Sequence, residues 1–412
     1  MKRAFRMNRV KIADINSQIE DNLSGIRVVK SFANEEIENE KFKKGNDGFL
    51  DAKKNSYRYM GGYNARLTAF TTAITVVVML SGGVMIARGK GNITDLITFL
   101  LYINVFTEPI KTLIDFTEQF QNGYSGFERF MEMISVIPDI KDAPDAQSMQ
   151  EVKGNISFEN VSFHYADSDQ MVLNHVNLDV PAGEYVALVG SSGAGKSTLS
   201  AGLIPRFYDV TDGKITIDGK DIRNVSQHEL REKLGYVPQK AVLFSGDIAS
   251  NILYGNPEGS EAEMTEAATI AQATEFIEQK KKKYKSTISQ GGSNVSGGQK
   301  QRLSIARAIA KHPDVYIFDD SFSALDYKTD ATLRAKLKEK TSESTVMIVA
   351  QRISTILHAD QIIVLDDGQI VGKGTHKELL KTCEAYYQIA SSQLSEKELE
   401  EDLKEVESYA KR

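Results

Sequence analysis

The sequence predicts a two-part fold, in which transmembrane α-helices are followed by an α/β domain with an antiparallel β edge and a helical subdomain. Three observations lead to this prediction. An uncharged run extends from Leu67 to Ala87. From Gly154 onward, short β-rich segments alternate with turns. The residues from Gly190 to Ser197 form a phosphate-binding pattern between an apolar run and a segment that can be helical.

The run from Leu67 to Ala87 is long enough to cross a bilayer of roughly 30 Å as a helix. Arg66 and Arg88 flank it, and a buried helix of a soluble protein is the alternative. A second apolar run, Leu96 to Phe106, is shorter, so hydropathy alone does not decide whether it crosses the membrane. The short Gly-rich link Arg88–Asn92 predicts a helical hairpin, and the excess of basic residues before the first span places its loop outside.

Helical spacing continues with mixed charge from Lys111 to Ile137, which predicts a long helix leaving the membrane. Residues 138–154 are polar and contain two prolines, so we expect a linker and a domain boundary there. The second domain is predicted over 155–390, with a helical subdomain at about 240–310. Residues 391–412 have i,i+4 charge pairs and few apolar side chains, which predicts a charged helical tail.

Gly190 to Ser197 reads GSSGAGKS and follows the apolar run Tyr185–Val189. In a strand–loop–helix context, the glycines let backbone N–H groups surround the phosphates of a nucleotide. Lys196 adds a positive charge, and the Ser197 hydroxyl is placed to bind Mg²⁺. A glycine-rich turn without a ligand is the alternative. The pattern predicts that the chain binds a nucleoside triphosphate.

Two further segments carry phosphate chemistry. Val315–Asp319 is an apolar run that ends in a carboxylate, as expected for a strand that presents an acid to Mg²⁺, and Asp320 follows where a residue orienting the attacking water would lie. Ser296, Gly297 and Gly298 open a helix-like segment and form a second anion site. That site is redundant within one chain, unless it reaches a nucleotide bound to another subunit. A plain helix cap is the alternative.

With these motifs in family order, the chain resembles one half of an ABC-type exporter, in which a membrane domain precedes the nucleotide-binding domain. The resemblance implies a P-loop domain of the RecA-like type, binding of ATP and Mg²⁺, and ATP-driven transport. Asn22–Asn34 resembles the cytosolic end of the fourth membrane helix, leading into a coupling helix near Ala33–Glu38. The resemblance therefore implies that only the last two membrane spans are present and that the chain is truncated at its N-terminus.

The resemblance also implies site residues, which fall into four groups. The nucleotide-binding group is Tyr165, Gly190, Ser191, Ser192, Gly193, Ala194, Gly195, Lys196, Ser197 and Thr198. The metal group is Ser197, Gln239 and Asp319. The catalytic group is Asp320, Gln239 and Gln351. The group that faces a partner subunit is the signature, Ser296, Gly297, Gly298 and Gln299, together with Asp326 of the D-loop.

Two positions depart from the family pattern. The carboxylate after the Walker B aspartate is usually Glu and is Asp320 here, and the switch position usually holds His and has Gln351. Such paired changes resemble the degenerate half of heterodimeric exporters. Shortening the side chain by about 1 Å can cost ~10²-fold in rate, and Gln cannot take a positive charge near neutral pH as His can. We expect a site that binds ATP well and hydrolyses it slowly.

The expected function is therefore an ATP-driven efflux subunit of the cell membrane. We expect it to be multi-pass, with its nucleotide-binding domain in the cytoplasm and with a second half-transporter as partner, in a heterodimer rather than a homodimer. The substrate is expected to be a small molecule, a lipid or a peptide. The alternatives are a soluble P-loop ATPase of the DNA-repair or translation type, a regulatory subunit that binds ATP without turnover, and a non-functional fragment.

Composition narrows these classes. A formal charge of −6 argues against a general nucleic-acid binder. A single cysteine excludes an internal disulfide framework and a cysteine-built zinc site. The apolar fraction of 41% over 412 residues allows two or three domains with sizeable cores.

Overall fold

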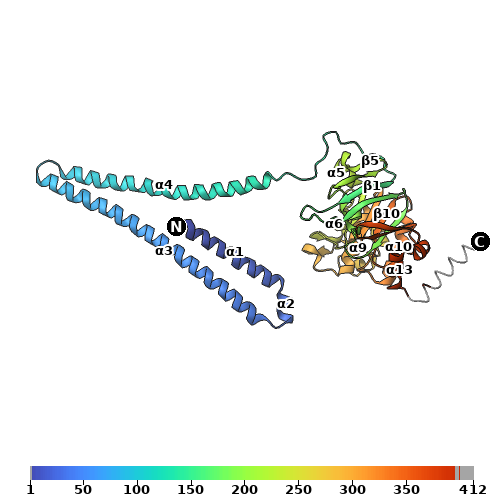
Figure 1. Ribbon diagram of the computed structural model, residues 1–412. Helices are drawn as coiled ribbons and strands as arrows, with labels where there is room; N and C mark the ends of the chain where they lie inside the picture. The colour runs from blue at the N-terminus through green and yellow to red at the C-terminus, as the bar shows by residue number, and fades with distance from the viewer. Residues whose placement is uncertain (1, 395–398, 400–412) are drawn as a thin grey trace, which may run out of the picture. The chain divides into compact units, whose positions relative to one another are not determined.

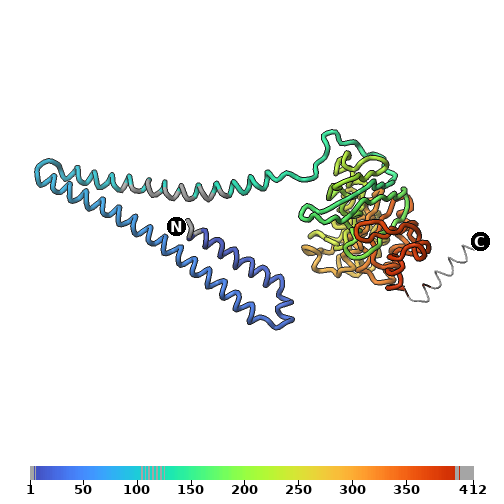
Figure 2. Tube along the Cα trace, in the orientation of Figure 1, coloured from blue at the N-terminus to red at the C-terminus, as the bar shows by residue number. Residues whose placement is uncertain are grey.

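The computed structural model describes residues 2–394 and residue 399. The predicted tail, 391–412, therefore lies mostly outside the described residues (Figure 2). The chain divides into two compact units, residues 1–137 and 138–412. The fold class expected from the sequence, membrane-type helices followed by an α/β domain with an antiparallel sheet and a helical part, is confirmed (Figure 1).

The first unit contains only helices, which are α1 (Lys2–Ser24), α2 (Ile26–Ser31), α3 (Glu35–Ala87) and α4 (Ile93–Ile134). Helix α1 packs along the first half of α3 (Figure 1). At this contact Ala52 and Ser56 of α3 are buried, and the Ser56 hydroxyl donates to the backbone oxygens of Ala52 and Ala4 at 3.0 and 3.1 Å. Small side chains let the two helices approach closely, and the hydroxyl is satisfied within the contact.

A short, separate helix lies between α1 and α3, just upstream of the segment in which we expected a coupling helix. We expected a coupling helix near Ala33–Glu38, whereas the separate short helix is α2, Ile26–Ser31. Ala33 has a positive φ of 51°, a conformation that ends a right-handed helix. Ala33–Glu38 therefore contains the turn and the first residues of α3, whose three glutamates in the first turn suit a helix N-terminus.

Helices α3 and α4 form the predicted hairpin around Arg88–Asn92 (Figures 1 and 2). Helix α4 begins with a capping box, in which the Asn92 N–H donates to the Asp95 carboxylate at 3.2 Å. Close approach at the tip depends on Gly82, because an added Cβ would lie 2.5 Å from the Leu96 side chain. Among the described residues, α3 alone is long and apolar enough to cross a membrane, and the apolar part of α4, Ile93–Ile103, is shorter.

The second unit is built on two larger sheets. The first has four antiparallel strands in the order β2-β1-β4-β5, and the second has six strands in the order β12-β11-β3-β10-β9-β6, parallel except for β12. A two-stranded pair, β7-β8, completes the strands of the described residues. The bounds are β1 Ile156–Phe163, β2 Leu173–Val180, β3 Tyr185–Gly190, β4 Asp212–Ile217, β5 Lys220–Asp221, β6 Leu234–Val237, β7 Gly246–Asp247, β8 Thr287–Ile288, β9 Val315–Asp319, β10 Thr345–Val349, β11 Gln361–Asp366 and β12 Gln369–Gly374.

Helices flank these sheets and enclose two apolar cores, one between the two larger sheets and one toward the helical part (Figure 1). The strands β3, β9 and β10 are buried along nearly their whole length, as expected for parallel strands covered on both faces. The helices are η1 Thr198–Leu203, η2 Ile222–Asn224, α5 Gln227–Glu232, α6 Ile248–Leu253, α7 Glu261–Ile270, α8 Thr274–Glu278, η3 Lys283–Lys285, η4 Gln290–Gly292, α9 Gly297–Ala310, α10 Tyr327–Lys340, α11 Ile353–Ile356, α12 His376–Thr382 and α13 Glu384–Ser391.

The segment 138–154, expected as a linker, belongs to the second unit and packs against the rest of it. Arg206, which is 4% exposed, donates to the Lys141 backbone oxygen at 3.2 Å. The Asp218 carboxylate accepts the backbone N–H groups of Lys153, Gly154 and Asn155 at 2.7 to 3.2 Å. These bonds satisfy backbone N–H and C=O groups of the segment and hold it in place, although its composition predicts only a loop.

Candidate functional site

The loop Gly190–Ser197 connects β3 to a helical turn that begins at Lys196 and continues as η1. Gly195 has a φ of 94°, and an added Cβ would lie 2.8 Å from the Val172 backbone oxygen, so only glycine fits there. The Lys196 ammonium donates to the backbone oxygens of Gly190 and Ser191 at 3.0 and 2.5 Å. The cation is thus held over the concave side of the loop, where an anion would neutralise it.

Ser197 and Asp319 meet at the carboxyl ends of β3 and β9. The Ser197 hydroxyl donates to Asp319 Oδ1 at 2.6 Å. Burial raises the pKa of the Asp319 carboxyl; the hydrogen bond from Ser197 opposes this shift and the charge of Asp320 adds to it. Burial lowers the pKa of the Lys196 ammonium, and both carboxylates oppose that shift. A hydroxyl beside a carboxylate is a set of hard oxygen donors that fits Mg²⁺ bound to phosphate.

The metal would depend on the nucleotide for most of its ligands. Over the described part of the chain, no cluster of three His, Cys, Asp or Glu side chains is arranged to hold an ion. Mg²⁺ is commonly held by one or two protein oxygens together with phosphate oxygens and waters, so the pair Ser197 and Asp319 is sufficient on the protein side.

Two amide side chains donate hydrogen bonds to the Asp320 carboxylate. Gln239 Nε2 donates to Asp320 Oδ2 at 3.0 Å, and Gln351 Nε2 donates to the same oxygen at 2.8 Å. Gln239 follows β6 and Gln351 follows β10, so three parallel strands of one sheet bring the group together. Asp320 is 7% exposed and has a positive φ of 45°. This conformation is unusual for a residue other than glycine, and such strained positions cluster at functional sites.

Tyr165 lies beside the phosphate loop. Its hydroxyl is 2.9 Å from Thr198 Oγ1, and its ring makes edge contacts with Phe163 and Tyr208. A polar groove of about 310 Å³ next to it is lined by residues that include Tyr165, Met171, Gly193 and Gly368. Gly193 of the phosphate loop is among the lining residues, so the groove adjoins that loop. Tyr208 is a member of this aromatic cluster that the motif search did not identify.

The signature residues lie apart from this group, at the start of α9. Ser296 is the N-cap of α9, and it forms a capping box in which Gln299 N donates to Ser296 Oγ at 3.3 Å. The plain cap that the sequence left as an alternative is therefore present. Gly297 and Gly298 begin the helix, and a Cβ at Gly297 would meet nothing within 4 Å. Asp326 caps α10 in the same way, by accepting the Thr329 N–H at 3.0 Å.

Arg352 joins two of these segments and was not predicted. Its guanidinium donates to the backbone oxygens of Ser323 and Leu325 at 3.1 and 3.5 Å. The residue next to Gln351 thus holds the chain that leads from Asp320 to Asp326. No local sequence pattern predicts such a contact, because its acceptors are backbone carbonyl groups, which every residue has.

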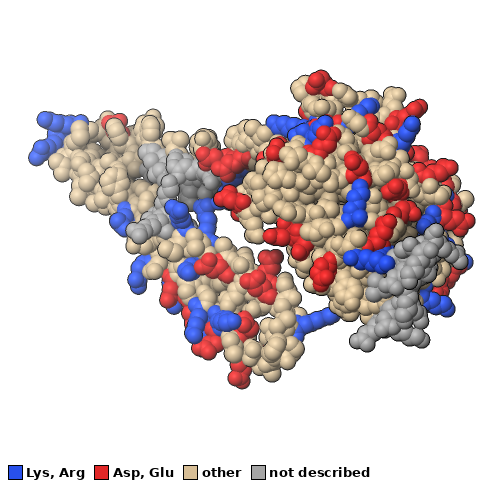
Figure 3. All heavy atoms as spheres, turned by 45° about the vertical axis from the view of Figure 1, so that its right-hand side comes forward, with Lys and Arg blue, Asp and Glu red and all other residues tan. Residues whose placement is uncertain are grey.

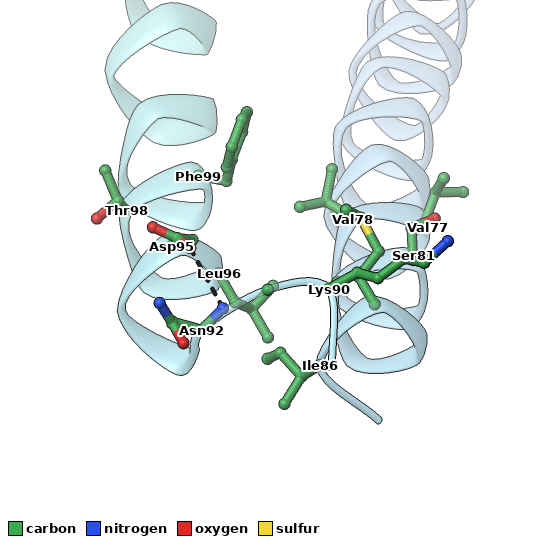
Figure 4. A pocket seen from close by; sticks show the side chains of 13 residues that line it. Val77, Val78, Ser81, Ile86, Lys90, Asn92, Asp95, Leu96, Thr98 and Phe99 are labelled. Carbon is green, nitrogen blue, oxygen red and sulfur yellow. Dashed lines mark hydrogen bonds between the residues drawn. The ribbon is translucent and has the colours of Figure 1, made fainter. Parts of the chain in front are cut away.

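The hairpin contains a second, separate cavity. It has a volume of about 420 Å³ and lies between α3 and α4 near their loop, lined by mostly apolar side chains that include Val78, Leu96 and Phe99, with Lys90 and Asp95 also at its border (Figure 4). Large apolar side chains are exposed along both helices. Figure 3 shows basic side chains at the tip of the hairpin and charges of both signs over the visible face of the second unit.

Comparison with known proteins identifies both units. Residues 1–110 match the ABC transporter transmembrane region, and residues 173–323 match the ABC transporter domain. The chain is 37% identical over 396 residues to the uncharacterized ABC transporter ATP-binding protein YwjA of Bacillus subtilis, which covers 96% of this chain and 68% of that protein. The chain belongs to the ABC transporter family.

Other relatives carry more specific names. The putative multidrug export ATP-binding/permease protein YgaD of Bacillus subtilis is 37% identical, over 92% of this chain and 65% of that protein. The ATP-dependent lipid A-core flippase of Syntrophus aciditrophicus is 34% identical, over 98% and 67%. A bacterial Atm1-family ABC exporter with ATP bound has a TM-score of 0.86 and 31% identity, over 96% of this chain and 69% of that one. The chain spans about two thirds of the length of these relatives.

The membrane-type helices and the ABC domain are thus fused in one exporter half, as expected from the sequence. The ABC domain implies ATP binding, and exporters of this family act in a membrane as dimers.

Proposed function

We propose that this chain is the ATP-binding and membrane subunit of an ABC exporter that couples ATP binding and hydrolysis to efflux. The observation that carries the proposal is the convergence of Ser197, Asp319 and Asp320 beside the loop that holds Lys196. The names of the relatives support a substrate that is drug-like or a lipid, and a peptide is the third class that we keep.

Each segment has a role in this proposal. Residues 1–137 form part of the membrane domain, 138–154 connect it to the nucleotide-binding domain at 155–390, and 391–412 form a charged tail. Helix α2 is the element best suited to act as the coupling helix, because it is short and separate and lies between two long helices. We propose a multi-pass arrangement in the cell membrane, with α3 and α4 as spans and the nucleotide-binding domain in the cytoplasm. Exposed apolar side chains along both helices support contact with lipid.

In the nucleotide site, Tyr165 stacks on the base and the backbone from Gly190 to Lys196 surrounds the phosphates. The residues that contribute backbone N–H groups or side chains to this loop are Gly190, Ser191, Ser192, Gly193, Ala194, Gly195, Lys196, Ser197 and Thr198. Mg²⁺ would be held by Ser197 and Asp319 with the Gln239 amide oxygen, and would neutralise charge on the phosphates. Asp320 and Gln351 would orient the attacking water.

The partner is proposed to be a second half-transporter that is not identical to this chain. Two nucleotide domains would close head-to-tail, so that Ser296, Gly297, Gly298 and Gln299 contact the ATP of the partner and Asp326 faces it. The pairing of Asp320 with Gln351 supports a weakly hydrolytic site on this chain. A regulatory subunit without turnover is the second candidate, supported by the two amide groups that already occupy Asp320 Oδ2.

Replacing Lys196 tests nucleotide binding. Lys196→Ala should abolish ATP binding, because a charge-assisted contact to the phosphates is lost, at a cost of several kcal/mol. The domain should stay folded, because the ammonium is only half-buried and its two partners are loop carbonyls. Photolabelling with an azido-ATP measures the effect. Labelling of the variant at wild-type efficiency would reject the proposed site.

A further inference from the structure

We propose that Gln393 is a positioning residue of the nucleotide site, which holds the segment Gln351–Ile353 in place from the end of the C-terminal helix. Neither the sequence motifs nor the family comparison assigns a role to this residue. The inference rests on the proposed function, because it concerns the same site.

Gln393 binds the backbone of this segment at two points. Its Nε2 donates to the Gln351 backbone oxygen at 2.8 Å, and its Oε1 accepts the Ile353 N–H at 2.9 Å. One amide side chain thus satisfies a carbonyl and an N–H on either side of Arg352. Two bonds from one planar amide fix both the position and the orientation of the backbone, which a single bond does not.

The segment held in this way carries two contacts of the site. The Gln351 side chain donates to Asp320 Oδ2 at 2.8 Å. The Arg352 side chain donates to the Ser323 and Leu325 backbone oxygens at 3.1 and 3.5 Å. Gln393 therefore acts on Asp320 through Gln351, and on the chain leading to Asp326 through Arg352.

The packing of α13 places Gln393 next to the segment Gln351–Ile353. Helix α13 buries Tyr386 and Ala390 completely, in the same apolar core as Ile353 and Ile356 of the segment that follows Gln351. Beyond α13, the N–H groups of Gln393 and Leu394 bond to the Ala390 oxygen at 3.0 and 2.8 Å, so this turn is tied to the end of the helix. The turn that carries Gln393 is thus anchored to a helix that packs Tyr386 and Ala390 into the core.

The full chain with single substitutions, reconstituted with its partner or alone, tests the proposal. Gln393→Ala removes both bonds. Gln393→Glu keeps the shape and the acceptor for Ile353 but cannot donate to the Gln351 oxygen. Gln388→Ala is the matched control, because Gln388 lies on α13 just before Gln393 and its side-chain amide donates to the Glu384 carboxylate, not to the segment.

Two measurements are made. Hydrogen exchange of the peptide that contains Ile353 should become roughly three- to tenfold faster in Gln393→Ala, which loses the acceptor for the Ile353 N–H. The increase should be smaller in Gln393→Glu, which keeps that acceptor and loses only the bond to the Gln351 oxygen. Single-turnover hydrolysis at this chain's own site should slow about tenfold or more at unchanged ATP affinity, because misplacement by about 1 Å can cost ~10²-fold. Steady-state turnover of the complex should change by no more than a few-fold, as for Asp320→Asn. Gln388→Ala should leave both values at wild type.

Unchanged exchange in Gln393→Ala, or equal effects from Gln388→Ala, overturns the proposal. Loss of ATP affinity equal to the loss of rate also overturns it, since that would indicate a general structural role. Failure of the proposed function looks different, because the wild-type chain itself would then not bind azido-ATP.

Discussion

At the level of single residues, Asp320 and Gln351 each differ in one chemical respect from the residues usual at their positions. Asp320 has the shorter reach, and Gln351 has no proton to gain or lose near neutral pH. The structure adds that Gln351 donates to Asp320 itself, at 2.8 Å. The Gln amide carries its N–H donors at every pH near neutrality, so it can always make this bond. A neutral imidazole could donate to Asp320 only in the tautomer that has its proton on the nearer nitrogen.

We expect Asp320→Asn to change turnover of the assembled complex by no more than a few-fold, because we propose that this site is already slow. Removal of the partner's catalytic carboxylate should abolish turnover. Asp320→Glu with Gln351→His should raise hydrolysis at this site by restoring reach and a titratable group. Steady-state ATPase assays of the purified complex decide between a heterodimer and a homodimer with two working sites. Loss of more than about 90% of activity in Asp320→Asn alone, on the ~10²-fold scale of a catalytic group, would favour the homodimer.

The pKa shifts of Asp319 and Lys196 predict how Mg²⁺-dependent ATP binding varies with pH. Because the pKa of Asp319 is raised, protons compete with Mg²⁺ at a higher pH than for an ordinary aspartate, and binding falls on the acid side. Because the pKa of Lys196 is lowered, its charge is lost at a lower pH than for an ordinary lysine, and binding falls on the alkaline side. Gln351 adds no limb of its own. Titration of a fluorescent ATP analogue measures both limbs, and an acid limb that persists in Asp319→Asn or in EDTA contradicts the assignment.

These residues differ in how far the sequence predicts them. Lys196, Ser197 and Asp319 lie in patterns whose spacing is required by the phosphate geometry, and the structure brings Ser197 and Asp319 to 2.6 Å. Gln393 lies in no pattern. Its partners are backbone groups 40 and 42 residues away along the chain. Every residue has such groups, so the sequence does not indicate which of them Gln393 binds.

At the level of elements, the residues that cap α9 are the same ones that the proposed contact with a partner's ATP requires. Ser296 caps the helix in the chain itself, and an N-terminus with Gly297 and Gly298 leaves N–H groups and open space for an anion. A cap and a contact to a partner's ATP are compatible, because the hydroxyl can accept from Gln299 while it donates elsewhere.

Ser296→Arg separates the two roles. The larger side chain blocks the face of α9 that a partner's nucleotide would approach, so hydrolysis in the complex should stop. ATP binding at this chain's own loop should remain nearly intact, because Ser296 lies apart from Lys196 in the fold. Ser296→Asn serves as a control that retains the cap, since Asn caps helices as well as Ser does. A complex that keeps its turnover with Ser296→Arg would refute the head-to-tail arrangement.

The boundaries of helices and strands were predictable where the apolar residues follow one clear pattern, and less so elsewhere. The strand Val315–Asp319 and the β-strand before the phosphate loop follow from continuous apolar runs. Helix α3 extends from Glu35, far upstream of the uncharged run, because its polar half packs on α1 over long distances in sequence. Helix α4 continues through Pro109, which local rules mark as a possible break. The segment 138–154 docks through Arg206 and Asp218, and polar composition cannot indicate that.

At the level of the whole molecule, the two units differ in the polarity of their surfaces. Apolar side chains such as Phe70, Leu80 and Phe106 are more than half exposed on α3 and α4. The second unit buries its apolar side chains in two cores and carries mixed charge outside (Figure 3). Such long exposed apolar helices are unstable in water, and the first unit therefore requires lipid or other membrane helices around it.

We expect the chain to behave as an integral membrane protein. Washing membranes with alkaline carbonate releases peripheral proteins, because it disrupts their electrostatic contacts with the membrane. Helices embedded in lipid stay in place. The chain should stay in the pellet and require detergent for release, since α3 contains an apolar stretch long enough to cross a bilayer of roughly 30 Å. A variant with Val77→Arg and Leu80→Arg, two charges in the middle of the uncharged run, should shift into the supernatant or fail to insert, because each arginine costs about 2.5 to 3.5 kcal/mol at the centre of a spanning helix. Quantitative release of the wild-type chain by carbonate would reject the membrane assignment and restore the soluble P-loop ATPase as the better reading.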